Sequence, residues 1–231
     1  MKPSRFLFRF LRKAVIPNLP AKWRLPVQFW SHTRLATLEP EMRYLDLLSE
    51  KRTTAIDVGA NIGLYSFAFS RLFKKVHAFE INPSHSRDLV AYGAKNVEIH
   101  QMGLSNRSGD AVLYTPIHPT GLRLESWASL EPSNCPEACR LEECQVRVGR
   151  LDDFGFQECS FLKIDVEGHE VEVLQGAIET IARTRPRILI EVRGKNLATV
   201  DSLLADNGLK RIDIRTLLGR PGADGNYFYI P

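Results

Sequence analysis

The stretch Thr54-Ala-Ile-Asp-Val-Gly-Ala-Asn-Ile-Gly63 runs from an apolar, partly β-branched segment into a turn with two glycines, and apolar residues then recur at helical spacing. A short apolar run before such a turn is typical of a buried strand. Gly59 and Gly63 let the backbone turn sharply and approach a ligand without interference from a Cβ. The following helix presents unpaired N–H groups at its start. The stretch therefore predicts a strand, a turn and a helix that form a ligand cradle.

Strands and helices alternate along much of the remaining chain. The expected strands are Thr54–Val58, Lys75–Phe79, Val97–Gln101, Phe161–Val166 and Arg187–Val192. The expected helices are Ile62–Phe73, Pro83–Lys95, Glu170–Thr184 and Leu197–Asn207. This alternation implies βαβ units, so we expect an α/β fold with a doubly wound, mostly parallel sheet. The closing runs Leu209–Ile214 and Asn226–Ile230 are expected to form an antiparallel terminal strand pair.

The 231 residues fit one domain with an appendage. We expect a basic helical appendage over residues 1–50 and the main domain over residues 51–231. Within that domain, a short strand is expected at Ala111–Tyr114. Residues 115–144 then show no regular pattern, which resumes at Gln145–Val148. An irregular insertion of that length is usually a lid or a binding loop.

Charge is distributed unevenly between the two parts. Residues 1–24 carry seven basic side chains and no acid, so the remaining residues sum to −3 when the total is +4. A nucleic-acid partner is therefore not expected, because the main body lacks a basic face. Residues 1–16 could contact an anionic membrane surface as a basic amphipathic helix, although packing against the protein itself or a partner is favoured. Without a signal sequence or a spanning segment, we expect a cytoplasmic protein, with peripheral membrane attachment left open.

Three cysteines, Cys135, Cys139 and Cys144, lie in the irregular segment. Together with His118 they could hold zinc, but their spacing matches no standard zinc site. Nothing indicates export, so disulfides are not expected. We interpret them as ordinary loop cysteines.

The acidic residues at the strand ends indicate the type of ligand. The turn departs from the dinucleotide fingerprint, because Asn61 stands at its second glycine position. Asp57 at the entrance would repel a pyrophosphate, whereas it suits the ammonium group of S-adenosylmethionine. Glu80 ends the second strand 23 residues later and is placed to bind a ribose diol. A ribose-binding acid is shared with nicotinamide enzymes, so Glu80 alone indicates an adenosine ribose and not a methyl donor.

The other candidate cofactor residues surround these two acids. Ile81 is expected against the adenine face, Gln101 at the adenine edge, and Gly103 and Leu104 along its side. The full candidate set for binding S-adenosylmethionine is Asp57, Gly59, Ala60, Asn61, Gly63, Tyr65, Glu80, Ile81, Asn82, Gln101, Gly103 and Leu104.

Four ionisable residues are expected near the methyl-bearing sulfur of the cofactor, at what we call the reacting end of the site. If the strand continued in extended form beyond Asp165, its period of two would place Asp165, Glu167 and His169 on one side. Glu191 ends the neighbouring strand. Methyl transfer to a hydroxyl needs alignment and a base, for which His169 and Asp165 are the candidates, while Glu167 and Glu191 orient the acceptor. Bound Mg²⁺ or Mn²⁺ is left open, although no motif demands a metal and no metal ligand is assigned.

These motifs resemble those of the FkbM-family methyltransferases. The likeness rests on Ala55-Ile-Asp-Val-Gly-Ala-Asn-Ile-Gly-Leu-Tyr65, Ala78-Phe-Glu-Ile-Asn-Pro83, Leu151-Asp-Asp153 and Lys163-Ile-Asp-Val-Glu-Gly-His-Glu170, with Leu38-Glu-Pro-Glu41 as the lead-in. The resemblance implies a Rossmann-like methyltransferase fold and an S-adenosylmethionine-dependent O-methyltransferase acting on hydroxyls of sugars, polysaccharides or other small molecules. Family members often carry proline where Ile81 stands, and segment 115–144 has no recognised counterpart.

Three alternatives remain open from the sequence. An N-methyltransferase acting on a protein or small molecule would keep the same cradle, but the Asn/Asp-Pro-Pro-Tyr type of signature is missing. A nicotinamide-dependent oxidoreductase agrees with the sheet and with Glu80, but Asp57 and Asn61 oppose it. A non-catalytic member that keeps only the fold is opposed by the retained acids at 165, 167 and 191.

Overall fold

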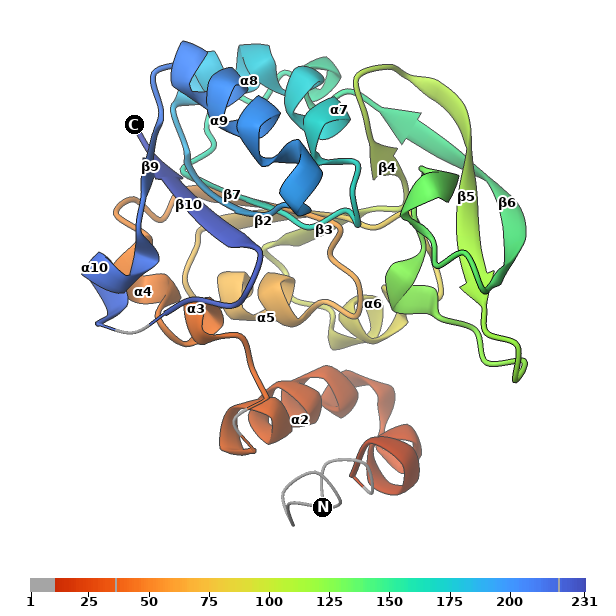
Figure 1. Ribbon diagram of the computed structural model, residues 1–231. Coiled ribbons are helices and arrows are strands. Elements are labelled where there is room, and N and C mark those ends of the chain that lie inside the picture. Colours follow the sequence, from red (N-terminus) through yellow and green to blue (C-terminus); the bar gives the residue numbers. More distant parts are fainter. Residues whose placement is uncertain (1–10, 36, 220) are drawn as a thin grey trace.

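A computed structural model describes residues 11–35, 37–219 and 221–231, and its centre is a seven-stranded sheet (Figure 1). The strand order is β3-β2-β1-β7-β8-β10-β9. Five neighbouring strands run parallel, and β10 pairs antiparallel with both β8 and β9. The doubly wound, mostly parallel sheet with an antiparallel terminal pair is therefore confirmed. The strands are β1 Thr54–Val58, β2 Lys75–Phe79, β3 Val97–His100, β7 Phe161–Ile164, β8 Arg187–Glu191, β9 Lys210–Ile212 and β10 Asn226–Ile230.

Helices cover both faces of this sheet. In Figure 1, α5 (Leu64–Ser70) and α6 (Arg87–Tyr92) lie below it, whereas α7 (Glu170–Gln175), α8 (Ile178–Thr184) and α9 (Leu197–Asp206) lie above. The strands β1 and β7 are buried throughout because both faces are covered, which explains why they are mostly apolar apart from Asp57 and Lys163. The shorter helices are α3 Pro40–Arg43, α4 Leu45–Leu48 and α10 Ile214–Leu218. Single helical turns other than α-helix occupy Leu11–Val15, Ile16–Asn18, Glu125–Trp127, Pro132–Asn134, Leu151–Phe154 and Gly194–Asn196.

The predicted helix over Glu170–Thr184 is in fact two helices, which separate at Gly176 and Ala177. A Cβ on Gly176 would lie 1.9 Å from the carbonyl oxygen of Ser105. The backbone of the β4–β5 connection thus presses against the helix at this glycine, and the chain restarts in a new helix after it. Helices α5 and α6 are shorter than predicted at both ends, whereas α9 begins at Leu197 as predicted.

The prediction that residues 115–144 form an irregular insertion is wrong at both ends. Strands β5 (Gly109–Ile117) and β6 (Arg140–Gly149) form a long antiparallel pair, and β4 (Gly103–Leu104) joins β6 to complete a second sheet. Only residues 118–139 connect β5 and β6, and we call them the connecting loop. The sequence analysis predicted only Gln145–Val148 of β6, because residues 140–144 carry charged side chains on both faces and show no apolar alternation.

The N-terminal region packs on the outside of α5 and α6 through α2 (Ala21–Arg34) (Figure 1). Leu25 is fully buried, and the rings of Phe29 and Phe67 lie 5.0 Å apart. The predicted membrane contact of residues 1–16 falls largely outside the described residues, since the description begins at residue 11. Within the described ranges, none of the helices has the length and apolar character to cross a membrane.

All four cysteines are free thiols, with Cys135 and Cys159 buried and Cys144 exposed. His118 shares a hydrogen bond with Thr120 through its Nδ1 atom at 2.8 Å. The groups of potential metal ligands among the described residues contain neither a cysteine nor His118.

Candidate active site

A cleft opens at the carboxyl ends of β1, β2 and β7, where ligands gather in doubly wound sheets. It has two lobes that share several lining residues: Gly59, Asn61, His85, Glu125, Ser126 and Asp165. The first lobe holds about 720 Å³ of space, its open mouth included, which suits a nucleoside-sized ligand. Of the predicted site residues, it is lined by Gly59, Asn61, Glu80, Ile81, Asn82, Gly103, Leu104, Asp165, Glu167 and His169. The second lobe adds Asp57, Ala60 and Tyr65.

The turn after β1 is held in left-handed backbone conformations. The φ angles of Gly59, Asn61 and Gly63 are +77°, +51° and +89°. A Cβ on Gly59 would lie 1.8 Å from the carbonyl oxygen of Asp165, and one on Gly63 would lie 2.8 Å from Leu89. Glycine at 59 and 63 is thus explained by close packing against β7 and α6. Gly63 itself lines neither lobe.

Glu80 is fixed in place by two backbone N–H groups. Asn61 donates to one of its carboxylate oxygens at 2.6 Å, and Asn82 donates to the other at 2.7 Å. Burial raises the pKa of Glu80, and these two N–H donors oppose that rise. Because each oxygen keeps a further lone pair, the carboxylate can accept two more hydrogen bonds from a ligand in the first lobe.

An apolar wall stands beside Glu80 in the first lobe, made by Ile81, Met102, Gly103 and Leu104. A Cβ on Gly103 would lie 2.7 Å from Ile81, so this wall is tightly packed. The side chain of Asn82 turns back and accepts hydrogen bonds from Ser84. Gln101 is exposed and lines neither lobe, so the structure does not bring this predicted residue to the cleft.

A buried lysine that the sequence analysis did not assign lies in the wall of the second lobe. Lys163 is 1% exposed, and its Nζ lies 3.8 Å from Asp165 Oδ2 and 5.1 Å from the centre of the Tyr65 ring. Burial alone would lower the pKa of Lys163, but the carboxylates of Asp165, Glu39, Glu191 and Asp57 outweigh it and raise the pKa. Lys163 is therefore a buried cation that interacts electrostatically with four carboxylates. Its signal in the sequence is a lysine inside an otherwise apolar strand.

Two of the carboxylates around Lys163, those of Asp57 and Glu191, have raised pKa values. Burial raises the pKa of Asp57 to about 6, against the hydrogen bond from Ser66 and the charge of Lys163. Burial and the charge of Asp165 raise the pKa of Glu191 to about 7. Glu191 lines neither lobe but interacts electrostatically with Asp165 and Lys163.

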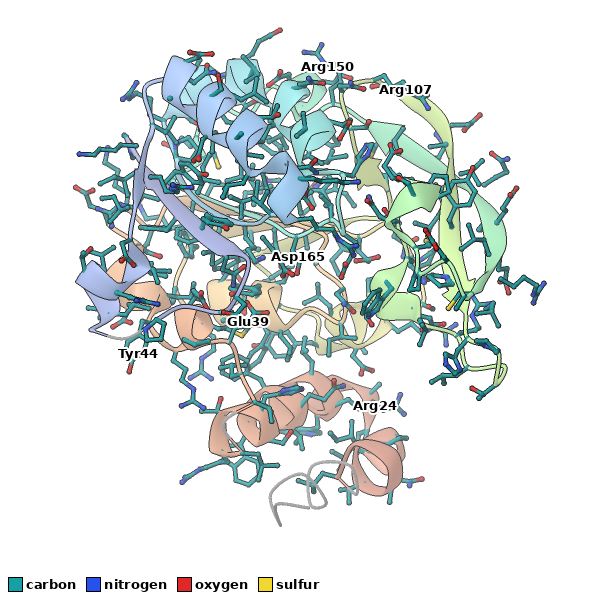
Figure 2. All side chains as sticks on the ribbon, viewed as in Figure 1. Arg24, Glu39, Tyr44, Arg107, Arg150 and Asp165 are labelled. Atoms are coloured by element: carbon teal, nitrogen blue, oxygen red, sulfur yellow. The ribbon has the colours of Figure 1, made fainter. Side chains whose placement is uncertain are left out.

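Glu39 joins these carboxylates from the chain before β1, where it accepts hydrogen bonds from Tyr65 Oη at 2.7 Å and Asn226 Nδ2 at 3.1 Å. Figure 2 shows Glu39 and Asp165 near the middle of the molecule, and both line the second lobe. The second lobe is thus strongly polar on its inner side.

The chain after β7 does not stay extended as expected. Glu167 has a φ of +52°, and its carboxylate is paired with Arg193 at 2.6 Å. His169 stands directly before α7, where its Nε2 lies 3.0 Å from Ser105 Oγ. Asp165, Glu167 and His169 still meet along the first lobe, but only Asp165 also lines the second.

The acids at 165, 167 and 191 do not form a metal-binding group. Among the described residues, two sets of three or more potential ligands lie close enough to share an ion: His77, Glu98 and His100, and Glu131, His169 and Glu172. Asp165, Glu167 and Glu191 are therefore not arranged to share a metal ion. His169 belongs to the set with Glu131 and Glu172.

This fold and cleft define the class of Rossmann-like methyltransferases, in which the sheet order, the acid after β2 and the polar reacting end occur together. The family model described as the methyltransferase FkbM domain matches residues 57–210, which is more than half of the chain. The chain belongs to the FkbM methyltransferase family, as the sequence motifs predicted. Membership classes it as an S-adenosylmethionine-dependent methyltransferase.

Individual relatives agree with this membership. Methyltransferase 1 of Beauveria bassiana (strain ARSEF 2860) is 28% identical over 175 residues, which cover 66% of this chain and 70% of that protein. The crystal structure of methyltransferase FkbM from Methylobacillus flagellatus KT superposes with a TM-score of 0.52 at 15% identity and covers 99% of this chain. The chain spans 59% of the length of that protein. At this identity, the structural likeness concerns the fold.

Proposed function

We propose that the first lobe binds S-adenosylmethionine and that the chain transfers its methyl group to a hydroxyl of a sugar, a polysaccharide or another small polar acceptor in the second lobe. The observation that carries this proposal is the position of Asp165, the one reacting-end acid of the sequence analysis that lines both lobes. A side chain at that boundary faces both the bound donor and the acceptor hydroxyl.

The residues of the first lobe fit the donor chemically. Glu80 is held with free lone pairs toward the lobe, which suits the two hydroxyls of a ribose. Ile81, Met102 and Leu104 offer an apolar surface for an adenine ring. Asp57, in the second lobe, provides a buried carboxylate for an ammonium group. When bound, the sulfonium donor supplies an activated methyl group, and the protein aligns it with the acceptor.

The second lobe fits a hydroxyl-rich acceptor. The polar and charged residues of its lining include His32, Glu39, Arg123, Glu125, Lys163 and Asp165. Carboxylates and basic side chains of this kind hydrogen-bond to sugar hydroxyls, and a carboxylate can accept the proton that the hydroxyl loses. Asp165 is the proposed base, and Lys163 is a positioning residue whose charge favours the ionised forms of the surrounding acids. His169 is less suited as the base, because it does not line the second lobe and its Nδ1 faces Glu131 and Glu172.

The acceptor class can be tested with donor that carries a labelled methyl group. We expect label to enter monosaccharide or polysaccharide fractions of a cell extract, in a bond that resists mild acid and hydroxylamine as an ether does. Label found mainly on amine nitrogens of proteins or small molecules would contradict the proposal and favour the N-methyltransferase alternative. A nicotinamide oxidoreductase is not favoured, since the family is one of methyltransferases.

Replacing Glu80 with glutamine is expected to weaken binding of S-adenosylhomocysteine by ~30-fold, measured by isothermal titration calorimetry. The new amide would point an N–H group at either Asn61 N–H or Asn82 N–H, and one charged hydrogen bond to the ribose would be lost. A charged hydrogen bond contributes about 2 kcal/mol, which corresponds to this factor. Glu158→Gln, exposed before the start of β7 at the opposite end of the sheet, is the matched control. If both variants bound S-adenosylhomocysteine with equal affinity, Glu80 would not be a donor-binding residue.

Peripheral membrane contact of the N-terminal region remains a proposal, and α2 now supports it. Trp23 and Trp30 are 54% and 55% exposed and stand two helical turns apart, so they share one face. Residues 1–24 add seven basic side chains without an acid. Exposed tryptophans beside basic residues suit the headgroup region of an anionic bilayer.

The double substitution Trp23→Ala and Trp30→Ala is therefore expected to weaken binding to vesicles of phosphatidylcholine and phosphatidylglycerol by ~10-fold in a sedimentation assay. Trp127→Ala, which removes an exposed tryptophan from the connecting loop, should leave binding unchanged. Equal binding of the unsubstituted chain to neutral vesicles would argue against an electrostatic contact of this kind.

A further inference from the structure

A buried imidazole nitrogen beside the cleft has no hydrogen-bond partner. His169 is only 6% exposed, and its Nδ1 is one of the few buried side-chain polar atoms without a partner among the described residues. Buried polar atoms are nearly always bonded, so such an atom needs an explanation. Its other nitrogen, Nε2, lies 3.0 Å from Ser105 Oγ.

Ser105 Oγ is the hydrogen-bond partner of the other ring nitrogen. It lies 3.0 Å from Nε2 and can accept a hydrogen from it, while its own hydroxyl group lies 3.5 Å from Asn106 Oδ1. In the tautomer that carries its hydrogen on Nε2, Nδ1 presents a lone pair. Most metal-binding histidines are oriented in this way, by a hydrogen bond from the ring nitrogen that does not bind the metal.

Two carboxylates face this lone pair. Nδ1 lies 3.5 Å from Glu131 Oε1 and 3.6 Å from Glu172 Oε2, and the three atoms are all within 4.8 Å of one another. Three lone pairs that face one another repel unless a proton or a metal cation lies between them. Ligands placed about 2.1 Å from a tetrahedral metal are ~3.4 Å apart, which agrees with the two separations.

We propose that His169, Glu131 and Glu172 bind a divalent first-row cation of the Mn²⁺ and Zn²⁺ class. One imidazole with two carboxylates suits these ions. The carboxylates are 45% and 34% exposed and line a hollow open to solvent, so an ion can enter and the side chains can adjust. Arg107 and Asp110 line the same hollow, and Arg107 Nη1 donates to the carbonyl oxygen of Asp110 at 3.1 Å.

This cation would fasten the connecting loop to α7. Glu131 belongs to the loop, Glu172 belongs to α7, and the preceding loop residues Ser129 and Leu130 line the first lobe. Ser129 Oγ also donates to the carbonyl oxygen of Glu167 at 2.9 Å, so the loop already contacts the reacting end here. The site thus stabilises one wall of the cleft, and it does not depend on the proposed acceptor.

The second group of potential ligands provides an internal comparison. In that group, His77 Nδ1 and His100 Nε2 are hydrogen-bonded to each other at 3.0 Å, and Glu98 is paired with Lys75 at 3.4 Å. Its ligand atoms are therefore satisfied without an ion. His100→Gln is a suitable control for metal binding elsewhere in the protein.

The experiment titrates the chelator-treated full chain with MnCl₂ and follows free Mn²⁺ by electron paramagnetic resonance. We expect one ion per chain in the micromolar range, and at least ~10-fold weaker binding in Glu172→Gln and in Ser105→Ala. His100→Gln and Glu179→Gln, the latter exposed on α8, should bind as the unsubstituted chain does. Excess ZnCl₂ should displace the bound Mn²⁺ from the same site.

Three results would overturn the proposal. The first is binding of Mn²⁺ and Zn²⁺ no tighter than millimolar, with His169 protonated on both nitrogens in a ¹⁵N NMR spectrum. The second is binding that Glu172→Gln leaves unchanged. The third is binding that is lost in His100→Gln. Because Glu172 is partly exposed on a helix, its substitution is compatible with a folded protein, which circular dichroism would verify.

Discussion

Replacing Asp165 with asparagine is expected to lower kcat by ~10³-fold while the Kd for S-adenosylhomocysteine changes by less than ~3-fold. The carboxylate lines both lobes of the cleft, so it is the proposed group that takes the proton from the acceptor hydroxyl. Asparagine keeps the shape of the side chain but accepts no proton at neutral pH. Because the donor is held mainly by residues of the first lobe, its binding should be largely retained. Steady-state kinetics and calorimetry on the same preparation measure both quantities.

Asp110→Asn serves as the control for this substitution, since Asp110 is exposed on β5. It should retain full activity. If Asp165→Asn lost donor affinity and turnover to the same extent, Asp165 would be a binding residue only. If turnover were unchanged, Glu191, whose pKa is raised to about 7 by burial and by Asp165, would become the candidate base.

Most of the fold could be predicted because its buried strands carry the pattern directly. Strands β1 and β7 are buried throughout and mostly apolar, and glycine or acidic residues follow them. The first half of β6, residues 140–144, could not be predicted, because charged residues occupy both of its faces and the segment pairs with β5 through its backbone. The break at Gly176 depends on the distant backbone of Ser105, which no local pattern records.

The candidate site divides in the same way. Glu80 and Asp165 could be placed from the sequence, since each follows a strand and carboxyl ends of parallel strands meet at one edge. Lys163 could not be assigned, because its role depends on Glu39, Asp57, Asp165 and Glu191, which come from four separate segments. The position of Gln101 was misjudged, since the strand ends at His100 and the chain turns it outward.

Replacing Lys163 with methionine is expected to lower the free energy of unfolding by ~3 kcal/mol at pH 8, because a buried charge centre loses its cation while its acids remain. Lys163 is 1% exposed, and its raised pKa shows that the carboxylates favour its charged form in the fold. A raised lysine pKa contributes stability that is fully present below its unfolded pKa, so this contribution is complete between pH 5 and pH 8.

The loss should be smaller at pH 5 than at pH 8. Asp57 and Glu191 have folded pKa values raised to about 6 and about 7, so folding favours their protonated forms. The stability linked to those protonated forms is present below their unfolded pKa values and is lost as the pH rises through 6 and 7. At pH 5 both acids are largely neutral and need no cation, whereas at pH 8 both are ionised next to Asp165. Urea unfolding at the two pH values measures the difference, with Lys210→Met, exposed at the start of β9, as the control. A loss that is equal at both pH values would mean that Lys163 acts through packing, and that the acids around it do not depend on its charge.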